Sequence, residues 1–326
     1  MKTIAYSSPF VPAEWITAHG VRPVRLRPDP AAAARLAGPL MGVCPYARAF
    51  VGKAMSLPDV DAVVLATTCD QMRRAAEWPG LAGGRPVFLM NVPATWQTPA
   101  SVRLYRDELD RLGRLLVRLG GREPSRARLA EVMEDYDVRR AALRGMLGTL
   151  TARCASEAMA RFDLGEEVVP NEGAARVVTR GTPVAVIGGP LMSADTGVFD
   201  IIEKAGGRVV LDGTENGTRT LPTPFDRRRL RDDPMLELVD AYFGTIPDAF
   251  RRPDTLLYQW LGREPAASGA RGIIVWRYVW CDMWAAGVVR LREATGLPVL
   301  DVDVSGDEAE LARAANRIQA FLEVLG

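Results

Sequence analysis

The chain has 326 residues, 48% hydrophobic and 25% charged, which is typical of a globular protein long enough for two hydrophobic cores. Its formal net charge of +1 gives no electrostatic basis for binding nucleic acid or an anionic membrane surface. Neither a signal peptide nor a run of roughly 20 apolar residues is visible, so we expect a cytoplasmic protein that spans no membrane and keeps its thiols reduced.

In the first third of the sequence, short apolar runs alternate with helical patterns, which is typical of βαβ units and a parallel sheet. Strands are predicted at 3–6, 22–26, 39–43, 62–67 and 86–90. Helices are predicted at 12–18, from Pro45 and from about Asp70. Apolar residues then recur at helical spacing over 101–119, and a mostly helical stretch continues to about residue 162.

A second alternating block begins after Gly181. Its predicted strands are 184–187, 208–211, 272–276 and 299–304, and its predicted helices are 196–205, 233–245, 253–261, 282–295 and 307–325. We therefore predict an α/β fold with two doubly wound parallel-sheet domains of Rossmann or flavodoxin type. They comprise residues 1–100 and 181–326, and a helical region, 101–180, connects them.

Three of the four cysteines each follow a short apolar run at a predicted strand-to-helix turn: Cys44, Cys69 and Cys281. Because the carboxyl ends of parallel strands converge on one edge of a sheet, these thiols could meet there. Free backbone N–H groups and the helix dipole at such turns are expected to lower the thiol pKa toward thiolate, the form that ligates iron. Three thiolates could hold a metal cluster and leave one iron open for substrate.

Spacing alone does not separate ligands from buried structural cysteines. Cys44 and Cys69 stand 25 residues apart, no Cys-x-x-Cys occurs, and free cysteine is among the most buried residue types. We interpret Cys154, in a helical pattern without such a turn, as structural. The single histidine, His19, is explained by a position at a helix C-terminus and needs no catalytic role.

Several segments carry a resemblance to a known family, in the family's order and over nearly the whole chain. They are Ser8–Glu14 with His19–Arg25, Gly42–Arg48, Thr67–Asp70, Ile187–Pro190 through Ala205–Val210, Gly217–Arg219, and Trp280–Asp282 with Gly296–Leu300. These segments resemble the 2-hydroxyacyl-CoA dehydratase / benzoyl-CoA reductase family of iron–sulfur proteins. The resemblance implies that Cys44, Cys69 and Cys281 bind one [4Fe-4S] cluster whose fourth iron has no cysteine ligand.

The resemblance also implies a reaction: radical dehydration or reduction of an acyl-CoA-like thioester. One electron would give a ketyl radical anion that expels the hydroxyl, and the open iron would act as Lewis acid and electron donor. The resemblance implies that the electron comes from a separate ATP-dependent iron–sulfur activator protein, and the chain has no phosphate loop that could replace it. A homologous second subunit, or a second copy in a homodimer, is the implied partner.

Other site residues are weaker candidates. Ser8 and Glu14, beside the end of the first strand, could contact substrate, although Glu14 is also explained by the helix dipole. Arg48 could pair with a cluster sulfide or an anionic substrate, or form a surface ion pair. The chain departs from the family in being short and in carrying Ser7 and Ser8 where some relatives have cysteine, and one further cysteine is too few for a double-cubane cluster.

Aromatic residues crowd the third cysteine: Trp276, Tyr278, Trp280 and Trp284. They could shield a cluster and stack on an acyl group, or be ordinary core residues. The turn Gly188-Gly189-Pro190 could accept a phosphate or simply be a tight turn. Three functions stay open at this point: a catalytic cluster-bearing subunit, a non-catalytic cluster-bearing partner subunit that relays electrons or scaffolds a larger subunit, and a metal-free α/β binding protein.

Overall fold

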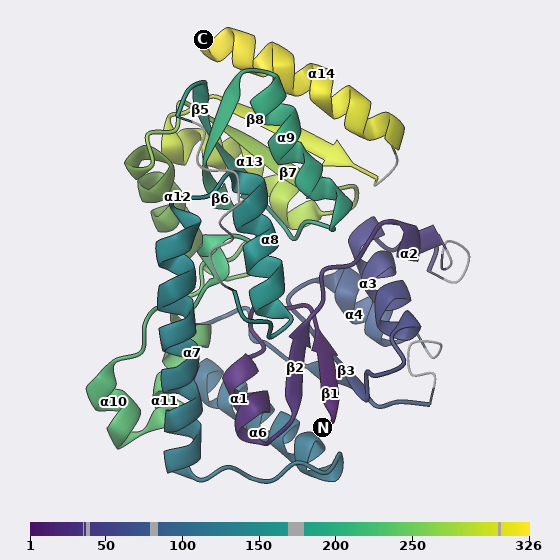
Figure 1. Ribbon diagram of the computed structural model, residues 1–326, viewed down its shortest axis with the longest axis vertical. Helices are drawn as coiled ribbons and strands as arrows, with labels where there is room; N and C mark the ends of the chain where they lie inside the picture. The colour runs from purple at the N-terminus through teal and green to yellow at the C-terminus, as the bar shows by residue number, and fades with distance from the viewer. Residues whose placement is uncertain (35, 37–39, 79–83, 169–178, 306–307) are drawn as a thin grey trace.

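The computed structural model describes residues 1–34, 36, 40–78, 84–168, 179–305 and 308–326 (Figure 1). Within these residues the strands form two four-stranded sheets, in both of which all pairings are parallel, and helices flank each sheet. The predicted α/β fold with two Rossmann- or flavodoxin-like units is therefore confirmed. No helix in the described part of the chain is both long and apolar enough to span a bilayer.

The first sheet has the strand order β2-β1-β3-β4. Its strands are β1 (Thr3–Tyr6), β2 (Arg22–Arg25), β3 (Ala62–Ala66) and β4 (Val87–Met90). Side chains of β1 and β3 alternate between two hydrophobic clusters, because successive residues of a strand point to opposite faces. One face packs under α1 (Ala13–Ala18) and α6 (Pro99–Arg118), and the other under α3 (Pro45–Ser56) and α4 (Asp70–Ala76).

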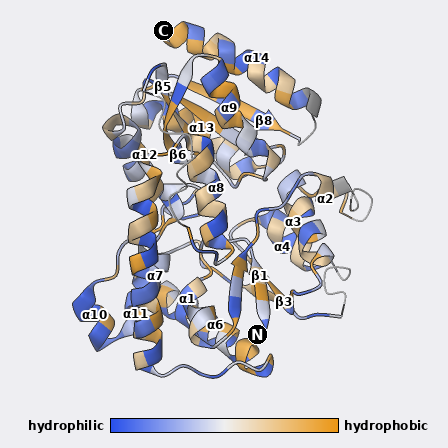
Figure 2. Cartoon of the chain, viewed as in Figure 1, coloured by the Kyte–Doolittle hydropathy of each residue, from blue (hydrophilic) through white to orange (hydrophobic). Residues whose placement is uncertain are grey.

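The second sheet repeats this plan with the order β6-β5-β7-β8. Its strands are β5 (Thr182–Gly188), β6 (Gly207–Gly213), β7 (Gly272–Tyr278) and β8 (Val299–Val304). Helices α9 (Gly197–Lys204) and α14 (Glu308–Leu325) cover one face, and α12 (Thr255–Ala267) and α13 (Asp282–Thr295) cover the other. Figure 2 shows the result as hydrophobic strands enclosed by helices whose outer faces are hydrophilic.

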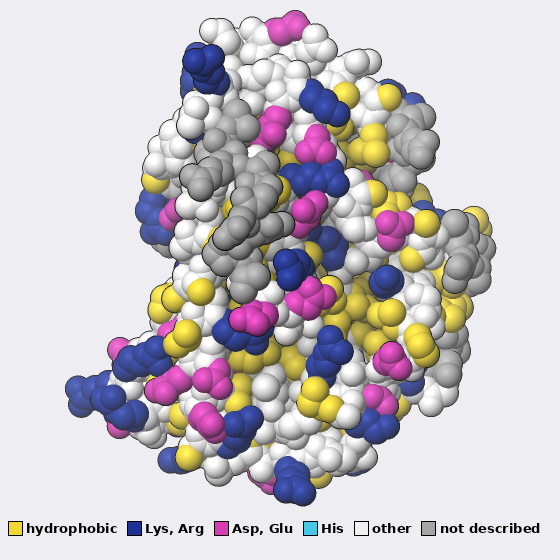
Figure 3. Space-filling view, in the orientation of Figure 1, with side chains coloured by type: hydrophobic (Ala, Val, Ile, Leu, Met, Phe, Trp, Pro, Cys, Tyr) yellow, Lys and Arg dark blue, Asp and Glu magenta, His cyan; other side chains and the backbone are white. Residues whose placement is uncertain are grey.

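Helices connect the two sheets and fill the space beside the first one. The long α7 (Arg126–Leu147) packs against α1, and α8 (Ala152–Asp163) lies beside α9 (Figure 1). The remaining elements are α2 (Ala31–Ala34), α10 (Arg227–Asp232), α11 (Pro234–Val239), a π-helix (Asp240–Gly244) and two short 3-10 helices (Ala194–Thr196 and Thr218–Thr220). On the face drawn in Figure 3 acidic and basic side chains are interspersed, except on α10, where arginines gather.

The strand predicted just before Cys44 is wrong. Residues 40–43 form turns, and Pro39 lies outside the described residues. β3 pairs directly with β1, so the chain between β2 and β3 adds no strand to the described sheet. Leu40 and Val43 are apolar because they pack into the core beside α3, where both are buried.

The two sheets share a hydrophobic core. One cluster contains Leu65 of β3 together with Val184 of β5 and Trp276 of β7. Hydrogen bonds also join the halves: the Ser193 backbone N–H donates to the Pro28 carbonyl at 2.9 Å, and the Trp96 indole N–H donates to the Pro253 carbonyl at 2.9 Å. The loops at the carboxyl ends of both sheets are thereby held against one another.

Candidate active site

A cavity of about 80 Å³ lies where the carboxyl ends of the two sheets meet. Residues that follow β1, β3, β5, β6 and β7 contribute to its wall. Cys44, Cys69 and Cys281 all line it. In open parallel sheets the crevice outside the strand ends is where ligands bind, so this cavity is the candidate active site.

Each of these cysteines is the residue that precedes the first turn of a helix: Cys44 before α3, Cys69 before α4 and Cys281 before α13. The Cys44 sulfur accepts a hydrogen bond from the Ala47 backbone N–H at 3.4 Å. The backbone N–H of Cys44 donates to Oε1 of Gln71 at 3.0 Å, which ties the first cysteine to the helix of the second.

The expected lowering of the thiol pKa is wrong for this cavity. Burial raises the pKa of Cys44 to about 12 and that of Cys281 to about 11, and it also raises the pKa of Cys69. The nearby backbone N–H groups act in the opposite direction but are outweighed by desolvation. Burial therefore favours neutral thiols, and a cation that binds here would have to displace their protons.

The donor set fits an iron–sulfur cluster. All four cysteines are free thiols, and three of them face one enclosed space, where soft sulfur ligands suit iron–sulfur chemistry. The described residues contain no group of three His, Cys, Asp or Glu side chains arranged around a single metal ion. A cubane cluster binds each thiolate at a different iron. The cysteine sulfurs around a cluster therefore lie farther apart than the ligand atoms around a single metal ion. Cys154 lies on α8 and does not line the cavity.

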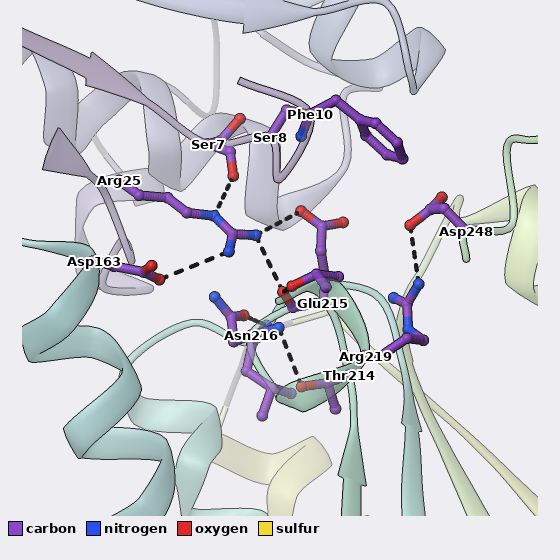
Figure 4. Close-up of polar contacts among 12 residues, drawn as sticks. Ser7, Ser8, Phe10, Arg25, Asp163, Thr214, Glu215, Asn216, Arg219 and Asp248 are labelled. Atoms are coloured by element: carbon purple, nitrogen blue, oxygen red, sulfur yellow. Dashed lines mark hydrogen bonds and ion pairs between the residues drawn. The ribbon is translucent and has the colours of Figure 1, made fainter. Parts of the chain in front are cut away.

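A polar part of the wall comes from the loop after β6, and this loop is held by a buried arginine of β2 that does not itself line the cavity (Figure 4). Nε of Arg25 donates to the Ser7 carbonyl at 2.8 Å, and its NH2 group donates to the Glu215 carbonyl at 3.1 Å. The same guanidinium lies 3.5 Å from Glu215 Oε1 and 3.7 Å from the Asp163 carboxylate. One side chain thus joins the first sheet, α8 and the second sheet beside the cavity.

Two acidic residues of this wall, Glu215 and Asp248, were not expected from the sequence. Burial raises the pKa of Glu215 to about 7, although Arg25 acts to lower it. Asp248 forms an ion pair with Arg219 at 3.1 Å (Figure 4). Glu215 stands two residues after a strand, a signal that could have found it, whereas Asp248 lies in an irregular segment without such a signal.

The other predicted site residues lie in different places. Ser8 lines the cavity and is buried, and its hydroxyl oxygen accepts a hydrogen bond from the Phe10 backbone N–H at 3.3 Å. Glu14 does not line it: this fully buried carboxylate pairs with Arg140 and accepts a hydrogen bond from the Tyr242 hydroxyl at 2.6 Å. A substrate contact from Glu14 would require breaking that pair. Arg48, on α3, is not among the lining residues either.

Three of the four aromatic residues near Cys281 line the cavity: Tyr278, Trp280 and Trp284. Trp276 is fully buried in the core instead. The Tyr278 hydroxyl donates to Asp195 and accepts from the Met192 backbone N–H at 2.8 Å, and its ring stacks on Tyr46 with centroids 6.0 Å apart.

Two further sequence features have ordinary positions. Gly189 and Pro190 line the cavity. Gly188 packs closely on the backbone of β7, which agrees with the interpretation of this segment as a tight turn. His19 ends α1, is 2% exposed, and its Nδ1 lies 2.7 Å from the Trp15 carbonyl oxygen, as expected for a residue at a helix C-terminus.

Among solved structures, weak similarity is found to the SBP FpvC from Pseudomonas aeruginosa in complex with Mn2+. Its sequence is 15% identical, the match covers 100% of this chain and 99% of that chain, and the TM-score is 0.24. A mutant of the laminin-binding adhesin Lmb from Streptococcus agalactiae is 11% identical, with 100% of both chains covered, at a TM-score of 0.23. TM-scores this low carry no argument about fold or function.

A search of curated proteins finds no match to this sequence. A protein family does match: 2-hydroxyglutaryl-CoA dehydratase, D-component, over residues 9–325. The match includes all three cysteine turns and every strand of the two sheets except β1. Because it spans nearly the whole sequence, the chain belongs to this family of dehydratase component subunits.

Proposed function

We propose that this chain is the cluster-bearing subunit of a 2-hydroxyacyl-CoA dehydratase, with Cys44, Cys69 and Cys281 holding one [4Fe-4S] cluster whose fourth iron stays open. The single observation that supports this most is the arrangement of three thiols from distant parts of the sequence around one cavity at facing sheet ends. The dehydratase family supplies the class of reaction. When bound, the cluster would supply one electron and a Lewis-acidic iron to the substrate.

The chain's own residues would do the remaining work. Glu215, with a pKa of about 7, can hold or release a proton at neutral pH, as removal of a hydroxyl and of a neighbouring C–H proton requires. The Ser8 hydroxyl can position the substrate by a hydrogen bond. The buried rings of Tyr278 and Trp284 exclude water from the same space.

The reductant and the partner subunit belong to this proposal as well. We expect a separate ATP-dependent iron–sulfur activator to deliver the electron, and a homologous second subunit or a second copy of the chain to complete the enzyme. Dehydration is not expected without the activator, and the active form is expected to be a homodimer or a complex with the homologous subunit.

Turnover of 2-hydroxyacyl-CoA thioesters tests the proposal. The anaerobically reconstituted protein should dehydrate at least one of them when a reduced activator and ATP are supplied, alone or after a homologous second subunit is added. If the protein bound iron but dehydrated none of the thioesters, with or without the second subunit, the result would favour the role of a non-catalytic partner subunit. Activity that does not depend on the three cysteines would contradict the assignment of the site.

A further inference from the structure

A second hollow, of about 550 Å³, lies at the edge of the first sheet. We call it the edge groove; it lies between Val24 of β2, Lys53 of α3 and Ala160 of α8. None of the described residues that line it also lines the three-cysteine cavity. Its volume is within the range of about 300–1,000 Å³ that is typical of small-molecule sites.

The position of β2 explains why the edge groove exists. β2 is an edge strand, and its residues Val24 and Leu26 point to the face of the sheet on which α3 packs. α8 reaches this edge through long side chains: Arg22 donates to the Leu164 carbonyl at 3.3 Å, and Arg27 donates to the Ser156 hydroxyl at 2.9 Å. Because arginines bridge the distance, an open space remains between the strand and the helix.

The floor of the edge groove is apolar and aliphatic. The apolar residues that line it are Val24, Leu26, Leu57, Val60, Ala160 and Leu164, and no aromatic residue is among the described lining residues. Figure 3 shows apolar side chains in a hollow between α8 and α3, with acidic and basic side chains around it. A ligand with a hydrocarbon body would remove this apolar surface from water, whereas an aromatic ligand would find no ring to stack on.

Basic side chains outnumber acidic ones in the wall of the edge groove. The basic residues are Arg22, Arg27, Lys53 and Arg153, and the acidic residues are Asp59 and Glu157. Arg153 and Glu157 pair with each other at 3.2 Å, so their charges offset one another. The other three cations are accompanied in the wall by one acid, and the groove therefore attracts anions.

These three cations have no acidic partner among the described side chains. Arg22 and Arg27 donate only to the neutral oxygen atoms of α8 and its end. Nε and Nη2 of Arg27 are buried without a hydrogen-bond acceptor in the described part of the chain. The Lys53 ammonium forms no hydrogen bond or ion pair with any described residue. Partly buried positive charge without a counterion costs free energy, which an anion in the groove would offset.

We propose that the edge groove is a second binding site, for an organic anion that carries a carboxylate or phosphate headgroup on an aliphatic body. The hydrocarbon lies on the apolar floor, and the headgroup lies beside Lys53, whose ammonium is free. The site is lined by β2 and α3 of the first unit and by Thr196 at the start of the second, so the ligand contacts both units. The proposal is independent of the cluster and of the dehydratase function.

Lys53 provides a site-specific reporter, because the chain has only three lysines, Lys2, Lys53 and Lys204. Reductive methylation with 13C-labelled formaldehyde keeps the amino groups charged and gives each lysine its own NMR signal. The signal that is missing in Lys53→Met is that of Lys53. We expect octanoate and octyl phosphate to shift this signal in a saturable manner. The signal of Lys204, which is exposed at the end of α9, should not move.

Calorimetry with a series of eight-carbon probes tests the class of ligand on the full-length chain. Octanoate and octyl phosphate should each bind about fivefold or more tightly than octanol, and octylamine should bind more weakly than octanol. Hexanoate, octanoate and decanoate should gain about two- to fourfold in affinity for each added CH₂ group. The tighter of the two anions identifies the headgroup.

Two variants with matched controls locate the binding. Lys53→Met keeps an apolar stem without the charge and should weaken octanoate about two- to fivefold, with octanol unchanged. Lys204→Met should leave both affinities as they are. Ala160→Phe fills the groove and should weaken both probes, whereas Ala142→Phe, at an exposed position of α7, should not. Melting temperatures show whether each variant keeps its fold, and Lys53→Met decides the question if Ala160→Phe does not.

Several results would overturn the proposal. They are equal affinities for octanoate, octanol and octylamine, an octanoate affinity that Lys53→Met leaves unchanged, saturable shifts at Lys2 or Lys204 in place of Lys53, and no binding of any probe. Each of these results would leave the dehydratase proposal standing, because the edge groove and the three-cysteine cavity share no lining residue among those described.

Discussion

At the scale of single residues, the site depends on three thiols whose burial favours the neutral form. Their sulfurs lie near helix N-termini, yet burial dominates their ionisation. A ligand that carries positive charge, such as iron, would reverse this balance because it favours the thiolate directly. The cysteines are therefore suited to metal binding more than to nucleophilic catalysis at neutral pH.

Replacement of any one cavity cysteine should remove most of the bound iron. Cys44→Ser, Cys69→Ser and Cys281→Ser are each expected to hold less than about half the iron of the native chain after anaerobic reconstitution, since each removes one of three thiolates. Cys154→Ser, on α8, serves as the matched control and should retain its iron. Full iron content in all three cavity variants would contradict the ligand assignment.

Glu215 makes the stability of the apoprotein depend on pH. Folding raises the pKa of Glu215 from an ordinary 4.5 to about 7. The contribution of Glu215 to the free energy of unfolding is therefore fully present below about pH 4.5 and is lost as the pH rises through about 7. Glu215→Gln cannot titrate and should show a flatter dependence of the unfolding free energy between about pH 5 and 8, measured by urea denaturation. Glu323→Gln, at an exposed position of α14, should keep the native slope. If the unfolding free energy of Glu215→Gln varied with pH as steeply as that of the native chain, the raised pKa of Glu215 would be refuted.

At the scale of elements, a buried ion pair joins α1 to α7. Glu14 and Arg140 are each about 1% exposed or less, and both also contact the Tyr242 hydroxyl, the carboxylate at 2.6 Å and the guanidinium at 3.3 Å. Arg140→Met leaves a buried carboxylate without its partner and should lower the unfolding free energy by about 3–5 kcal/mol. The double variant Glu14→Gln/Arg140→Met should lose clearly less, because no charge is left buried. Equal losses would mean that the pair itself is not the source of the effect.

The turn after β5 offers a second test at this scale. A Cβ atom on Gly188 would lie 2.0 Å from the Trp276 carbonyl oxygen of the paired strand β7. Gly188→Ala must therefore displace the strand that leads to Cys281, and we expect a loss of about 1–3 kcal/mol by urea denaturation together with weaker iron binding. At Gly189 the nearest atoms are 3.8 Å away, in the Trp284 ring, so Gly189→Ala should change stability little. Comparable losses at both positions would contradict this reading of the turn.

Much of the fold could be predicted because its signals are local. Strand β8 was predicted with its observed bounds, and the helices after Cys44 and Cys69 begin at the predicted residues, Pro45 and Asp70. The run before Cys44 was misread because a short apolar segment that packs into a core looks the same in sequence as a buried strand. Only the pairing of β3 with β1 distinguishes the two.

The candidate site was less predictable because it is built by tertiary contacts. Glu14 lies 126 positions before Arg140, so no local pattern could indicate that this acid is already paired. The pKa direction of the cysteines depends on how much water is excluded, which follows from packing of one sheet against the other. Asp248 is brought to the cavity by the same packing.

At the scale of the whole molecule, the two parallel sheets lie one above the other in Figure 1. Residues that follow strands of both sheets line one cavity. Arg25 links three segments at this junction, and one hydrophobic cluster extends through both sheets. Neither half alone supplies all three thiols, since Cys44 and Cys69 flank the first sheet and Cys281 follows the second. The site therefore exists only in the assembled fold.

Iron and acid-labile sulfide analysis of the full-length chain, purified and reconstituted without oxygen and examined by Mössbauer spectroscopy, tests the central claim most directly. We predict about four irons and four sulfides per chain, with one iron distinct from the other three because it lacks a thiolate. A chain that binds no iron and sulfide after reconstitution, or whose iron is lost equally in Cys154→Ser, would contradict the account.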